Sequence, residues 1–75
     1  MNQIHLDEEL QNLRSGLAIM AGEVERMVEL TRDCYAKRDS ALGIQVMDLD
    51  RSIDEHEIAL EKQCLDVLAL RAPFA

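Results

Sequence analysis

The sequence has few aromatic, proline or glycine residues, and this shortage narrows the fold. Tyr35 and Phe74 are its aromatic residues, and the 75 positions contain one proline and three glycines. Leucine, alanine, glutamate and methionine, which favour helix, dominate instead. The composition therefore indicates an all-α chain, and the length allows one small domain at most.

Basic residues are also scarce, because 8 lysines and arginines face 15 aspartates and glutamates, which gives a net charge of −7. Binding to nucleic acid or to an anionic membrane surface needs a basic surface, so we expect neither. No apolar run approaches the roughly 18 residues that a membrane-spanning helix requires. The first ten residues are polar and acidic, unlike a signal peptide. We therefore expect a cytoplasmic protein that is not embedded in a membrane.

The two cysteines, Cys34 and Cys64, do not form a disulfide pattern. In a hairpin that turns near residue 38 they lie roughly 33 Å apart, at about 1.5 Å of rise per residue. A disulfide needs Cα atoms within about 7 Å. We expect both cysteines to be reduced, small and mostly buried.

Motifs for catalysis are missing as well. The sequence has no nucleophile–base pair, no glycine-rich phosphate loop and no zinc-ligand spacing. His56 lies on an apolar line, where a histidine is more often a packed, hydrogen-bonded residue than a ligand. We therefore do not expect an enzyme.

Apolar residues of the first half follow one heptad pattern, with alternating spacings of four and three residues. This pattern predicts a helix over residues 6–36 that packs along a narrow seam. The predicted seam consists of Leu6, Leu10, Leu13, Leu17, Met20, Val24, Met27, Thr31 and Cys34.

The second half repeats the pattern and predicts a helix over residues 39–71. Asp39 is a good N-cap, and Pro73 disfavours continuation of the helix. The connection between the helices is short, which makes them antiparallel neighbours in a two-helix hairpin. The predicted seam here consists of Leu42, Val46, Leu49, Ile53, His56, Leu60, Gln63, Val67 and Leu70.

The second helix carries another apolar line on roughly its opposite side, formed by Ile44, Met47, Ile58 and Leu65. A helix that is apolar on two sides is usually covered by neighbouring helices on both sides. The simplest outcome is dimerisation of two hairpins into a four-helix bundle, with a swapped dimer or a tetramer as alternatives. The interface candidates are Leu10, Leu13, Leu17, Met20, Val24, Met27, Val46, Leu49, Ile53, Leu60 and Val67.

Four carboxylates, Asp50, Asp54, Glu57 and Glu61, lie along one strip of the second helix, at spacings of four, three and four. We call them the acidic strip. Such oxygens suit iron, manganese, zinc or calcium. One helix cannot surround a metal ion, so a site would need donors from another helix. The alternative is a solvated acidic flank without a ligand.

These residues resemble the N-terminal part of the PhoU family, the bacterial regulators of phosphate uptake. The resemblance spans nearly the whole chain, and its more specific parts are Asp50-x-x-Ile53-Asp54-x-x-Glu57 and Leu68-Ala69-Leu70-x-x-Pro73-x-Ala75. Other matching features are His5 with Asp7-Glu8-Glu9-Leu10, Met20 with Val24-Glu25, the turn Arg38-Asp39-Ser40-Ala41-Leu42, and Cys64-Leu65.

The resemblance implies a cytoplasmic, all-helical adaptor that links a phosphate ABC transporter ATPase to a sensor histidine kinase and damps phosphate-starvation signalling. Some members bind metal clusters through acidic (Glu/Asp)-x-x-x-Asp motifs, which Asp50 and Asp54 match here, with Glu57 beside them. The family continues into a third helix with a partner acidic motif, whereas this sequence ends at Ala75, as in a truncated or reduced form. A complete metal site within one chain is therefore not expected.

Three functions stay open, in this order: a PhoU-like regulatory adaptor, a generic dimerising coiled-coil protein, and a carboxylate-rich metal-binding bundle.

Overall fold

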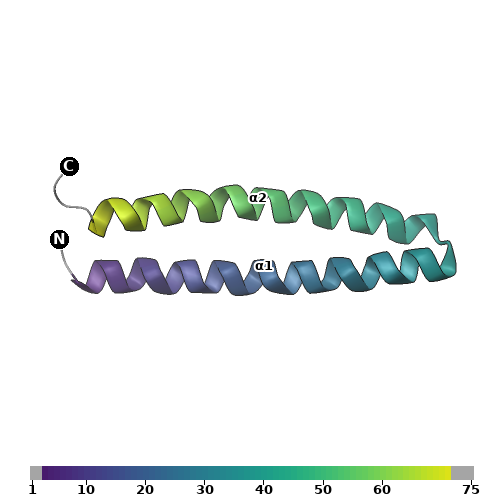
Figure 1. Cartoon of the computed structure of the whole chain (residues 1–75), viewed down its shortest axis with the longest axis horizontal. Coiled ribbons are helices and arrows are strands. Elements are labelled where there is room, and N and C mark those ends of the chain that lie inside the picture. The colour runs from purple at the N-terminus through teal and green to yellow at the C-terminus, as the bar shows by residue number, and fades with distance from the viewer. Residues whose placement is uncertain (1–2, 72–75) are drawn as a thin grey trace.

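Two long helices form an antiparallel hairpin in the computed structural model, which describes residues 3–71 (Figure 1). Helix α1 spans Gln3–Lys37 and helix α2 spans Ser40–Arg71. The hairpin measures 55 × 19 × 12 Å, so it is a rod one helix pair thick. The predicted all-α hairpin is confirmed. Helix α1 begins ahead of Leu6, because the heptad pattern marks the packed part of a helix rather than its first turn. Pro73, which we used to place the end of α2, lies outside the described residues.

The turn between the helices is made by Arg38 and Asp39. Arg38 adopts a left-handed backbone conformation with a φ of 51°. The Asp39 N–H donates to the Cys34 carbonyl at 3.3 Å, which is the capping bond of a Schellman motif. Asp39 then caps α2, because its Oδ1 accepts from the Ala41 N–H at 2.9 Å. The predicted N-cap role of Asp39 is confirmed.

Arg38 occupies a position that favours glycine, since a Cβ crowds the backbone in the left-handed region. Arg38→Gly should raise the free energy of unfolding by about 1 kcal/mol. The matched change Ala36→Gly lies inside the last turn of α1 and should lower the free energy of unfolding by about 1 kcal/mol. Urea unfolding followed by circular dichroism measures both variants. Equal effects of the two changes would contradict this description of the turn.

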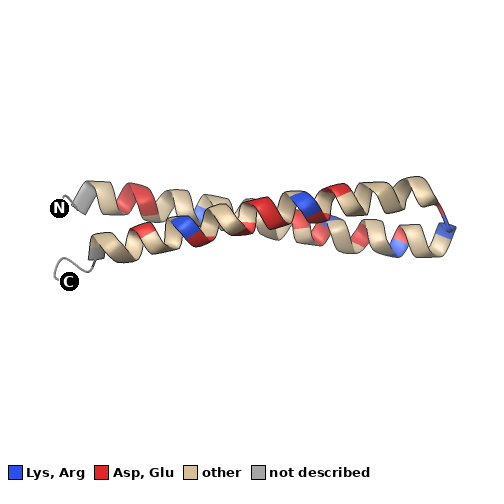
Figure 2. Ribbon diagram, turned by 90° about the horizontal axis from the view of Figure 1, so that it is seen from above, with Lys and Arg blue, Asp and Glu red and all other residues tan. Residues whose placement is uncertain are grey.

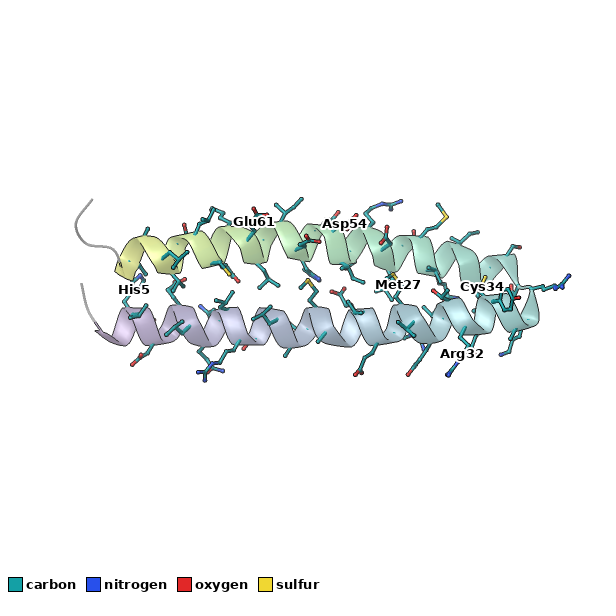
Figure 3. All side chains as sticks on the ribbon, viewed as in Figure 1. His5, Met27, Arg32, Cys34, Asp54 and Glu61 are labelled. Carbon is teal, nitrogen blue, oxygen red and sulfur yellow. The ribbon has the colours of Figure 1, made fainter. Side chains whose placement is uncertain are left out.

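The core is a thin seam between the two helices. Its buried apolar residues are Leu6, Leu30, Ile53, Leu60 and Val67, and no described side chain is completely buried. All predicted seam positions of α2 are buried or half-buried. Met27 and Cys34 on α1 point toward α2, whereas Arg32 points away (Figure 3).

The predicted seam of α1 is wrong at three of its nine positions, whereas Leu10 is half-buried as predicted. Leu17 and Val24 are 47% and 41% exposed, and Thr31 is exposed too. The positions one residue earlier, Gly16, Glu23 and Leu30, face α2 instead. The predicted seam and the observed seam are therefore two alternative heptad lines on α1. The alternating spacing fits either line, because both contain Leu6, Leu13, Met20, Met27 and Cys34. Whether Leu17 and Val24 contact another chain stays a prediction.

Gly16 allows α2 to approach α1 closely. A Cβ at position 16 would lie 2.6 Å from Cδ2 of the buried Leu60, whereas one at Gly22 would meet nothing within 4 Å. Gly22→Ala should therefore raise the free energy of unfolding by about 1 kcal/mol. Gly16→Ala should lower it, because displacing Leu60 costs about 1–3 kcal/mol. Urea midpoints of the two variants test this, and a stabilising Gly16→Ala would contradict the close contact.

Many large apolar side chains remain exposed. The predicted second line of α2 is at the surface, since Ile44, Met47, Ile58 and Leu65 are all more than 60% exposed. Val28 and Tyr35 on α1 are exposed as well. Neither helix in residues 3–71 is long and apolar enough to cross a membrane. The hairpin thus leaves much of its apolar surface uncovered.

Candidate functional site

A polar cluster interrupts the apolar seam near its middle. It consists of Glu23 from α1 and of Ser52 and His56 from α2. Ser52 Oγ donates a hydrogen bond to Glu23 Oε2 at 2.7 Å, and His56 Nδ1 lies 2.5 Å from Glu23 Oε1. The Glu23 side chain is 17% exposed and that of His56 is 45% exposed. One carboxylate therefore ties the two helices together through both of its oxygens.

The environment of Glu23 favours its charged form. The hydrogen bond from Ser52 lowers the pKa of the Glu23 carboxyl most, followed by the hydrogen bond from His56. Partial burial opposes this shift, and the charge of His56 adds a smaller lowering effect. The net result is a Glu23 pKa below its ordinary value, so the carboxylate stays ionised near neutral pH.

The cluster does not have the geometry of a catalytic triad. A nucleophilic serine gives its proton to a histidine, which a carboxylate orients from the far side. Here Ser52 donates its hydroxyl proton to Glu23, and His56 contacts the same carboxylate. Histidine is therefore not positioned to activate the serine. The arrangement suits helix pairing and recognition rather than nucleophilic catalysis.

The acidic strip lies along the exposed surface of α2. Acidic residues occur along both helices (Figure 2). Within residues 3–71, no three histidine, cysteine, aspartate or glutamate side chains are grouped closely enough to hold a metal ion. Asp50, Asp54 and Glu57 alone do not fit a metal site, so donors from another molecule would have to complete it. Metal binding at these residues stays a prediction, and elemental analysis of the purified protein is its direct test.

Two shallow hollows lie along one side of the hairpin, where α1 and α2 meet. The larger, about 330 Å³, is lined by Arg26, Leu30, Gln45, Asp48, Leu49 and Ser52. The smaller, about 130 Å³, is lined by Gly16, Ile19, His56, Ala59, Leu60 and Gln63. Ile19 and Arg26 are seven residues apart, as are Ser52 and Ala59, so both hollows lie on the same side. The polar cluster lies between them. We call this feature the side groove.

Sequence reasoning found part of this site. His56 was expected to be packed and hydrogen-bonded; its contact with Glu23 confirms the hydrogen bond, while the side chain remains 45% exposed. Glu23 was missed, because the apolar Val24 beside it fits the heptad pattern better. Both cysteines are free, as expected, but Cys64 is exposed rather than buried, because it follows the seam residue Gln63 and faces outward. Cys34 is half-buried beside the turn.

Comparison of the sequence with known proteins identifies a family that it matches. The family model described as the PhoU domain matches residues 17–75. The chain is 34% identical over 70 residues to a phosphate-specific transport system accessory protein PhoU homolog from Deinococcus radiodurans, covering 93% of this chain and 33% of that protein. No solved structure shows a significant match.

Two further relatives carry the same description. The PhoU homolog of Pseudomonas aeruginosa is 36% identical over 67 residues, covering 89% of this chain and 28% of the relative. PhoU of Escherichia coli is 28% identical over 67 residues, which again cover 89% of this chain and 28% of the relative. The chain thus spans about a third or less of the length of these relatives.

Proposed function

The chain belongs to the PhoU family, and from this premise we propose that it is a regulatory adaptor of phosphate transport that acts by helix-mediated association. The observation that carries the proposal is the apolar surface left open on both helices. Large apolar side chains at 60% exposure or more include Val28 and Tyr35 on α1 and Ile44, Met47, Ile58, Leu65 and Leu68 on α2. Apolar surface of this kind marks sites of association with other proteins or with a second copy.

The partners that family membership supports are the ATPase subunit of a phosphate ABC transporter and a sensor histidine kinase, both reached in the cytoplasm. An adaptor needs surfaces for binding but no reacting groups. The seam supplies the rigid pairing of α1 with α2, and the outward side chains supply the contacts. Self-association into a four-helix bundle is the simplest way to cover this surface when no partner is present.

A pull-down with the full chain tests the adaptor proposal. The wild-type chain should retain the transporter ATPase or the sensor kinase of the same organism. Leu17→Glu combined with Val28→Glu should lose it, because both residues are exposed on α1 and their substitution leaves the seam intact. Failure of the wild-type chain, and of a full-length PhoU protein from that organism, to retain either partner would refute the proposal.

The coiled-coil alternative makes a different prediction. If only pairing of helices matters, the exposed carboxylates have no role. Asp50→Asn combined with Asp54→Asn should then leave partner binding unchanged. A loss of partner binding in this variant, with helix content preserved, favours the PhoU-like adaptor, whose motif contains both aspartates.

A further inference from the structure

The side groove has a regular spacing. Gly16 at the smaller hollow and Leu30 at the larger hollow each lie seven residues from Glu23. At about 1.5 Å of rise per residue, the far end of each hollow is roughly 10 Å from the carboxylate. The near ends are lined by Ser52 and His56, which contact Glu23 directly. A helix that filled this groove would therefore need two apolar residues, each seven positions from a central cation.

Glu23 has capacity for such a cation. A carboxylate can accept about four hydrogen bonds, and Ser52 and His56 supply two. The lowered Glu23 pKa keeps the group negative. Because the side chain is still 17% exposed, a cation placed over the groove can reach it.

The outer side of α2 carries this same pattern. Ile44, Arg51 and Ile58 are spaced seven residues apart, and we call them the outer line. The two isoleucines are 62% and 69% exposed, and the Arg51 side chain is 71% exposed. Arg51 has a contact of 3.8 Å with Asp48 on the same helix, but such an exposed pair contributes little and leaves the guanidinium accessible.

We propose that the side groove binds the outer line of a second copy of this chain. Arg51 of that copy pairs with Glu23, while its Ile44 and Ile58 enter the two hollows. The inference rests on the proposed self-association, but it gives that association a head-to-tail geometry in place of a closed four-helix bundle. In this arrangement, α2 of one hairpin packs against both helices of a second hairpin and forms a third helix beside them.

Charges beside the central pair also match. Arg26, a lining residue of the groove, lies three residues from Glu23. Beside the outer line, Asp48 and Asp54 lie three residues before and after Arg51. Asp48 also lines the larger hollow of its own chain. With the second helix in either direction, one of these aspartates faces Arg26. Complementary charge at two neighbouring points, Glu23 with Arg51 and Arg26 with an aspartate, favours this occupant over an uncharged apolar helix.

The contact is head-to-tail, because the groove and the outer line are different surfaces. Such heterologous contacts build rings or open chains rather than closed two-fold dimers. Two variants can therefore be made, each of which loses one of the two surfaces and keeps the other. Arg51→Glu disables the outer line, and Ala59→Trp fills the smaller hollow, where Ala59 is exposed.

Sedimentation of the full chain tests the proposal. Wild type should associate with increasing concentration, while each variant alone should show a dissociation constant raised at least about tenfold. An equimolar mixture should form a one-to-one complex, since one variant keeps the groove and the other keeps the outer line. Ala21→Trp, a matched change at an exposed position outside both surfaces, should behave as wild type.

Three outcomes would overturn the inference: a mixture that stays at the single-chain mass, an Ala59→Trp variant that associates normally, or loss of association in Ala21→Trp alone. Circular dichroism confirms folding of each variant. If Ala59→Trp fails to fold, Gln45→Trp fills the larger hollow instead. Binding to the transporter ATPase or the kinase is measured separately, by the pull-down described above. A negative result for the side groove therefore does not refute the adaptor proposal.

Discussion

Replacing Leu60 with alanine should lower the free energy of unfolding by about 2–5 kcal/mol, the usual cost of truncating a buried leucine. Leu60 is 7% exposed and fills the space left by Gly16 on the opposite helix. A single core of this size gives only about 3–5 kcal/mol of stability in total. The variant should therefore lose most of its helix content at room temperature.

A matched substitution on the same helix separates burial from helix propensity. Leu68→Ala removes the same atoms from a side chain that is 62% exposed. It should change the free energy of unfolding by no more than about 0.5 kcal/mol. Urea unfolding at a fixed low protein concentration compares the two. Similar losses for Leu60→Ala and Leu68→Ala would show that the described seam is not the core.

Acid should weaken the hairpin through Glu23. Because the folded-state pKa of this carboxyl lies below its ordinary value of 4.5, the folded chain binds fewer protons than the unfolded chain between those two values. The stabilisation is complete above the ordinary value and is lost as the pH falls through the lowered one. Protonated Glu23 also loses acceptor capacity toward Ser52 and His56.

Glu23→Gln isolates this contribution, because glutamine keeps the shape and cannot ionise. Urea midpoints measured from neutral pH down to about pH 3 should decline less steeply in the variant than in wild type. The difference should appear only below the ordinary glutamate pKa. Parallel curves for the two proteins across this range would contradict the role assigned to the Glu23 carboxylate.

Much of the fold follows from the spacing of apolar residues. Helix α2 is buried or half-buried at every predicted seam position, because its longest heptad line is the one that faces α1. Its shorter second apolar line stays exposed. The turn was also predictable, since Asp39 combines capping chemistry with a position between the two patterns. A short connection then makes the helices antiparallel.

The seam of α1 could not be fixed in the same way. Two heptad lines share alternate residues, and hydrophobicity alone selects Leu17 and Val24. The structure selects Gly16 and Glu23, each for a reason that depends on the other helix. Gly16 admits the Leu60 side chain, and Glu23 bonds to Ser52 and His56. Such pairings appear only when both helices are considered in register.

The polar cluster has a second consequence for helix pairing. A polar group within an apolar seam penalises any other register, in which Glu23 would be buried without its donors. The cluster therefore specifies the hairpin while the apolar seam stabilises it. The acidic strip takes no part in this, because its residues lie on the exposed surface.

Sedimentation equilibrium of the wild-type chain over a wide concentration range, with helix content recorded at each point, tests the central claim most directly. The claim is that the uncovered aliphatic side chains require neighbours. We expect an average mass above 8.5 kDa that falls on dilution, together with a loss of helix. A fully helical species of 8.5 kDa at the lowest concentration would contradict it.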